Sequence, residues 1–191
     1  MIHLLVSLLL AAPPQQSLRE LAKPGVEAGI VVDCDCGPLE LREEVAKVDL
    51  IVWGTVTSAA PHLTTDETEI HTTYRLEVKQ IVARRTDDLA TTIGLEFTQR
   101  GGSLTIDGTP ISYDVGWLPK LRIGVETILL LNRDAKSGAY TNQAGVAFEV
   151  RENRATAMTL RRVLDPEYVG ISSTALVELL RQLVGETWTS R

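Results

Sequence analysis

The two cysteines of the chain stand one residue apart, in the run Asp33-Cys34-Asp35-Cys36-Gly37-Pro38. Two thiolates with flanking carboxylates could hold a soft or borderline metal ion, although a closed site of this kind needs about four ligands. A disulfide between them would close a tight, strained ring. We therefore take Cys34, Asp35 and Cys36 as candidate binding residues. Cys34 and Cys36 are candidate metal ligands, and free thiols or a link to another chain are the alternatives.

Other residues that could complete such a site are few. Of the three histidines, His3 lies in the apolar N-terminal run, His62 in an expected loop and His71 on the polar face of an expected strand. The chain has no CxxC or HxxxH spacing, no nucleophile elbow, no HExxH motif and no glycine-rich phosphate loop before a helix. The sequence predicts no enzyme, no catalytic residue and no cofactor, and it favours a structural role for the cysteine pair over metal binding.

The net charge of the chain bears on its partners, and its N-terminal residues bear on its location. The net charge of -6 argues against a nucleic-acid partner, which needs a basic face. Residues 1–12 are apolar but too few to span a bilayer, and they lie where a secretory signal peptide would lie. We expect export, an extracytoplasmic location and no transmembrane span. Residues 13–33 are then an N-terminal extension.

A short helix and a buried strand follow the cysteine pair. Leu41, Val45 and Val48 repeat at helical spacing, and acidic residues favour the N-terminal end of such a helix. The next run, residues 50–57, is apolar on both faces, so we expect a strand that is covered on both sides. Leu50 and Val52 should point one way, and Ile51 and Trp53 the other.

The rest of the chain is typical of short antiparallel strands and a closing helix. Alternation over residues 69–79 predicts a strand with one wet face, and the shift at Gln80 predicts a bulge. Residues 59–67 read as a polar loop, Gly101-Gly102 as a hairpin turn and Asp107-Gly108 as a second one. Further strands are expected near residues 93–97, 127–131, 146–150 and 156–160. An amphipathic helix capped by Ser172 or Ser173 should end at Gly185.

The order of these pieces resembles the netrin-like domain of the tissue inhibitors of metalloproteinases. The resemblance rests on Cys34-Asp35-Cys36, on Val48-Asp49-Leu50-Ile51-Val52-Trp53-Gly54-Thr55-Val56 and on Tyr74-Arg75-Leu76-Glu77-Val78. The chain is also similar to bacterial exported proteins of unknown role that carry a Gly-Gly turn and a run like Leu121 to Leu131. The resemblance implies a mainly β fold with an OB-like, five- or six-stranded antiparallel barrel.

The expected organisation is a barrel over residues 34–165 with a C-terminal helix over 166–191 packed on it. In the inhibitors the first cysteine is the mature N-terminus and chelates the protease zinc, whereas Cys34 is internal, which argues against that mechanism. We predict an exported, non-enzymatic OB-like module that binds another protein or a surface, and the sequence does not identify the ligand. The alternatives are a metalloprotease inhibitor-like protein and a soft-metal or redox protein that uses Cys34 and Cys36.

Overall fold

The computed structural model of the protein describes residues 17–23, 28–33, 40–86, 94–143, 145–158 and 170–188. The expected signal peptide and the candidate residues Cys34, Asp35 and Cys36 lie outside these ranges, and the predictions made for them remain predictions.

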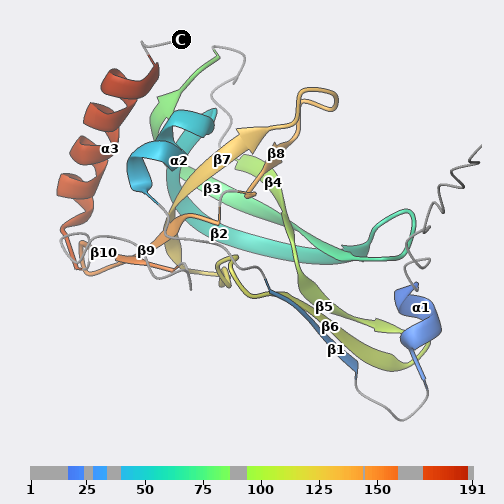
Figure 1. The fold of residues 1–191 in the computed structure, drawn as a ribbon. Helices are drawn as coiled ribbons and strands as arrows, with labels where there is room; N and C mark the ends of the chain where they lie inside the picture. The colour runs from blue at the N-terminus through green and yellow to red at the C-terminus, as the bar shows by residue number, and fades with distance from the viewer. Residues whose placement is uncertain are drawn as a thin grey trace, which may run out of the picture.

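The described part of the chain is mainly β, as predicted, and its strands form two sheets (Figure 1). The large sheet has the strand order β10-β9-β7-β2-β3-β4-β8, and β8 also pairs with β7. The small sheet has the order β1-β6-β5. The strands are β1 (Ala28–Val32), β2 (Leu50–Leu63), β3 (Ile70–Arg84), β4 (Gly94–Arg100), β5 (Gly102–Ile106), β6 (Thr109–Val115), β7 (Glu126–Arg133), β8 (Tyr140–Thr141), β9 (Ala147–Arg151) and β10 (Arg154–Ala157), and the helices are α1 (Leu18–Leu21), α2 (Leu41–Lys47) and α3 (Ser173–Trp188).

Strand β2 is the centre of the large sheet and is buried on both faces over its first half, as predicted. Leu50 and Val52 face one core, where they pack with residues such as Tyr74, Phe97 and Leu129. The rings of Tyr74 and Phe97 stack there, with centroids 5.4 Å apart. The register with β3 shifts at three places, one of them opposite Ile81, so the predicted bulge is confirmed. Such bulges bend the long β2–β3 ribbon that Figure 1 shows.

Helices α2 and α3 cover the other face of the large sheet, where they lie side by side (Figure 1). Leu41 and Val45 of α2 pack with Leu176 and Leu180 of α3, and both helices cover Ile51 and its neighbours in β7 and β9. The apolar spacing of both segments therefore predicted their buried faces correctly.

The C-terminal helix is longer than the sequence predicted. Gly185 was expected to end it, but α3 continues to Trp188. The indole Nε1 of Trp188 donates a hydrogen bond to the carbonyl oxygen of Val45 at 2.8 Å, and the guanidinium of Arg85 lies 4.6 Å from its ring centroid. These contacts offset the cost of one glycine inside a helix, which is about 1 kcal/mol.

Residues 59–67 are not wholly a loop, because β2 continues to Leu63. Strand β7 pairs with β2 only through Leu50–Thr55, so the second half of β2 is hydrogen-bonded along β3 while its side chains are largely exposed. Pro61 is tolerated because a strand that pairs on one side only does not need every N–H group for the ladder.

The small sheet was not predicted as a separate unit. Its strand β1 lies in the segment expected to be an N-terminal extension and pairs in parallel with β6. Asp107-Gly108 closes the β5–β6 hairpin as predicted, with both residues at positive φ. Gly101-Gly102 does not close a hairpin: β4 and β5 belong to different sheets, and the two glycines carry the chain from one to the other.

Candidate functional site

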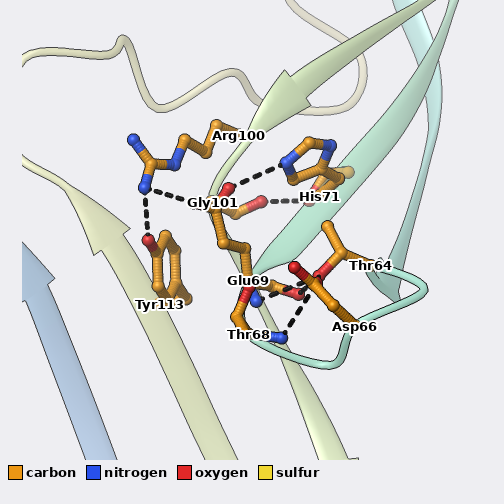
Figure 2. Close-up of polar contacts among 9 residues, drawn as sticks. Thr64, Asp66, Thr68, Glu69, His71, Arg100, Gly101 and Tyr113 are labelled. Carbon is orange, nitrogen blue, oxygen red and sulfur yellow. Dashed lines mark hydrogen bonds and ion pairs between the residues drawn. The ribbon is translucent and has the colours of Figure 1, made fainter. Parts of the chain in front are cut away.

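A cluster of polar side chains lies where the two sheets meet, at the ends of β3, β4 and β6 (Figure 2). His71 and Arg100 are paired across β3 and β4, so their side chains share a face. One guanidinium nitrogen of Arg100 donates to the Glu69 carboxylate and also to the Tyr113 hydroxyl, the latter at 2.7 Å. The other carboxylate oxygen of Glu69 lies 3.1 Å from His71 Nε2. Glu69 is thus held between a guanidinium and an imidazole.

The two glycines after Arg100 are required by the close packing at this junction. Thr72 Oγ1 donates to the Gly101 carbonyl oxygen at 2.6 Å. Gly102 has a φ of 144°, and a Cβ atom there would lie 2.4 Å from Thr72 Oγ1. A larger residue at Gly102 would therefore press against Thr72 of β3, and at Gly101, where φ is 104°, a Cβ atom would lie 3.2 Å from the Tyr113 carbonyl oxygen of β6.

The loop between β2 and β3 fixes Glu69 from the other side. The backbone N–H of Glu69 donates to Thr64 Oγ1 at 3.1 Å. Asp66 accepts hydrogen bonds from the Thr64 hydroxyl at 2.7 Å and from the Thr68 N–H at 3.2 Å (Figure 2). The hydrogen bond from the Thr64 hydroxyl has the largest effect, and together these hydrogen bonds hold the pKa of Asp66 below its usual value. Asp66 therefore acts as an ionised acceptor that orders the turn.

Arg100 remains charged and Tyr113 remains neutral in this setting. Partial burial disfavours the charged form of Arg100, but the hydrogen bond and ion pair with Glu69 outweigh it, so the pKa of Arg100 lies above its usual value. Burial raises the pKa of Tyr113, although the neighbouring guanidinium opposes this in part. The guanidinium carbon also lies 5.5 Å from the Tyr113 ring centroid.

The polar cluster borders a cavity of about 400 Å³, which we call the junction cavity. Two buried polar atoms of its lining residues have no hydrogen-bond partner in the described part of the chain, namely Arg100 Nε and Asn142 Oδ1. The amide nitrogen of Asn142 donates to Gln99 Oε1 at 2.8 Å, and Gln99 in turn donates to the Pro119 carbonyl oxygen. The residues that line the cavity include Glu69, His71, Arg100, Trp117, Asn142 and Gln143.

A second surface of interest is the outer edge of β1, which forms one side of the small sheet (Figure 1). Among the described residues β1 pairs with β6 alone, and none of its five residues is charged. Val31 on this strand is 73% exposed, and only Ile123 joins it as an exposed large hydrophobic residue in the described ranges. An uncharged edge of this kind is a template for pairing with another strand.

The sequence-predicted site lies outside the residues that the structure describes. Asp33, directly after β1, is described, but Cys34, Asp35 and Cys36 are not. His71, predicted to lie on the polar face of its strand, contacts Glu69. In the part of the chain that the structure describes, no three His, Cys, Asp or Glu side chains are grouped to hold a metal ion.

Fold and site together define a mainly β protein with two sheets, an ordered polar cluster and a cavity where the sheets meet. No protein-family model matches the chain, and no curated protein matches it either. None of the described helices has the length and apolar character needed to cross a membrane.

Proposed function

We propose that the protein is an exported, non-enzymatic module with an OB-like barrel, and that it binds another protein through the open edge of β1. The partner adds an extended segment beside β1 as a further strand. Export is supported by the apolar run at residues 1–12, which has the length of a signal-peptide core.

Strand pairing supports the OB-like barrel. Following the pairs in order leads from β2 to β3, to β4, to β8, to β7 and back to β2. Strand β8 makes this link through two residues, parallel to β4 and antiparallel to β7. This two-residue link does not close a barrel, and its pairing with β4 is parallel where an antiparallel barrel was predicted; the cycle of five paired strands is the feature that supports an OB-like barrel as a proposal. The kinship with netrin-like domains is proposed on the same basis.

The exposed, uncharged edge of β1 is the observation that carries the binding proposal. Natural proteins protect exposed edges with lysine, proline or a bulge, and the run Ala28-Gly29-Ile30-Val31-Val32 has none of these. Ala28, Ile30 and Val32 pack on the core of the small sheet, so Gly29 and Val31 face outward. An added strand would form backbone hydrogen bonds along β1, which provide affinity. It would also make an apolar contact with Val31, and side-chain contacts of this kind provide specificity in strand addition.

Replacing Val31 by lysine is expected to weaken peptide binding by about tenfold or more. Burying a valine side chain contributes about 1.5–3 kcal/mol, and each 1.4 kcal/mol is a factor of ten in affinity. The measurement uses peptides selected from a random displayed library on the full chain, with affinities from fluorescence anisotropy. Ile123→Lys is the matched control, since Ile123 is 62% exposed but belongs to no strand, and it should bind normally.

Two outcomes would contradict the proposal. The first is that Val31→Lys and Ile123→Lys bind the selected peptides equally well. The second is a wild-type chain that sediments as a dimer while Val31→Lys sediments as a monomer, because the occupant of the edge would then be a second copy of the chain.

A further inference from the structure

We propose that His62 and His71 form an open binding site for one divalent transition-metal ion of the Zn²⁺ class. The two imidazoles are its protein ligands, and water completes the coordination. This site lies on the β2–β3 ribbon and does not depend on the function proposed for the edge of β1. Three features support it: the pairing of the two histidines, the hydrogen bonds that their rings already make, and the charge around them.

The two histidines lie directly opposite each other on antiparallel strands. His62 of β2 pairs with His71 of β3, so both side chains lie on the same face of the ribbon. Their ring centroids are 6.3 Å apart, and the ring planes are inclined by 67°. Metal–nitrogen bonds of about 2.0–2.1 Å allow two imidazoles on one ion to have centroids at most about 6.4 Å apart. The rings are already within this span, and because His62 is exposed, its side chain can turn to bring them closer.

The hydrogen bonds of each ring determine which nitrogen can bind a metal. Nε2 of His71 lies 3.1 Å from Glu69 Oε2, and Nδ1 of His62 lies 3.4 Å from the Ala60 carbonyl oxygen. Both oxygens are acceptors, so in a neutral ring the nitrogen beside each of them carries the proton. Nδ1 of His71 and Nε2 of His62 then carry the lone pairs, and neither atom has a partner among the described residues.

Glu69 is the outer partner of His71 in this site rather than a third ligand. Metal-binding histidines almost always donate their other ring N–H to a carboxylate or a carbonyl, which fixes the tautomer and the orientation of the ring. Glu69 is itself held by Arg100 and by Thr64 (Figure 2). His71 is therefore oriented before an ion arrives. Two ligands and an outer carboxylate also agree with the lack of three grouped metal-binding side chains in the described ranges.

The charge around the pair favours a cation. The hollow beside the two rings is lined by the carboxylates of Asp66 and Glu69 and by three threonines, and no described Lys or Arg lines it. Arg100 offsets the charge of Glu69. Hydrogen bonds, that from the Thr64 hydroxyl first, hold the pKa of Asp66 below its usual value, so Asp66 is ionised. No described cation pairs with Asp66, and its charge attracts a divalent ion to the hollow.

The donor atoms indicate the class of metal. Imidazole nitrogen suits Zn²⁺, Ni²⁺ and Cu²⁺, whereas Mg²⁺ and Ca²⁺ take oxygen ligands. A site with two protein ligands leaves the remaining positions to water, as open zinc sites do with one position. We therefore expect a site that binds Zn²⁺ reversibly and discriminates against Mg²⁺.

The test is a titration of the full chain with ZnCl₂, followed by the ¹⁵N chemical shifts of the histidine rings. A background variant with His3→Gln, Cys34→Ser and Cys36→Ser removes the remaining imidazole and both thiols of the chain. In this background Zn²⁺ should shift His62 Nε2 and His71 Nδ1, and MgCl₂ at equal concentration should shift neither. Before metal is added, the spectra should show the protons on His71 Nε2 and His62 Nδ1.

Calorimetric titration of further variants in the same background measures the part of each side chain. His62→Gln and His71→Gln should each weaken Zn²⁺ binding by about tenfold or more, and Glu69→Gln by about tenfold, the lower end of the effect of an outer partner. Glu77→Gln is the matched control for Glu69→Gln, since Glu77 is an exposed carboxylate on the same strand, and it should bind normally. His62 is exposed, so its replacement tests the site without disturbing the fold.

Four outcomes would overturn the proposal. Zn²⁺ could leave the His62 and His71 signals unchanged, or Mg²⁺ could shift them equally. Only one of the two histidine variants could lose affinity, which would mean that the rings do not share an ion. Glu69→Gln and Glu77→Gln could also weaken binding equally, which would mean that a general surface charge holds the metal.

Discussion

Gly54→Ala is expected to lower the free energy of unfolding by about 3 kcal/mol, the upper end of the usual cost of overpacking. A Cβ atom at Gly54 would lie 2.3 Å from the backbone oxygen of Glu77 and 2.8 Å from Leu76 Cγ. The β2–β3 register shifts beside Gly54, and β7 pairs along its other side. The backbone therefore cannot move away without breaking one of two ladders. Urea denaturation followed by far-UV circular dichroism measures the change.

Gly185→Ala is the control for this substitution. Gly185 lies inside α3, and an added Cβ atom there would meet nothing within 4 Å. Alanine should therefore raise the free energy of unfolding by about 0.5–1 kcal/mol through helix propensity. A Gly54→Ala variant as stable as the wild type would contradict the close approach of β2 and β3 at the bulge.

Leu129→Ala should destabilise the protein by about 2–5 kcal/mol, the range for deleting a fully buried leucine side chain. Leu129 is 0% exposed, pairs with Val52 across β7 and β2, and packs in the same core as Tyr74 and Phe97. Strands on both sides fix this core, so it should collapse little around the cavity left by the mutation.

The comparison for Leu129→Ala is Leu179→Ala in α3. Leu179 is only partly buried at the edge of the other core, and alanine is a strong helix former, so the expected loss is about 1 kcal/mol or less. Equal losses for the two variants in the same urea series would contradict the position of Leu129 at the centre of the sheet.

Local patterns predicted those elements whose burial follows a regular period. The burial of β2 on both faces, the alternation of β3 and the apolar stripe of α3 each follow from the spacing of apolar residues within one continuous segment. The prediction failed where a distant contact decides the outcome. Trp188 extends α3 because it reaches Val45, and the exposed second half of β2 stays extended because β3 pairs with it.

The candidate site was less predictable for the same reason. Glu69 and Arg100 are 31 positions apart, and their contact depends on the β3–β4 register and on the two glycines that follow. The pairing of His71 with Arg100 offered no local signal. Asn142 reads as an ordinary loop residue in the sequence. The run Ile30-Val31-Val32 is apolar, but its place at the edge of a second sheet depends on parallel pairing with β6.

Hydrogen exchange of the backbone amides tests the central claim most directly. A peptide selected on the full chain should slow the exchange of alternate amides between Gly29 and Val32, because an added strand pairs with the N–H groups that point away from β6. Strand β5, at the opposite edge of the small sheet, should exchange as in the free protein. Protection confined to β5, to β10 or to the junction cavity, with β1 unchanged, would contradict the account.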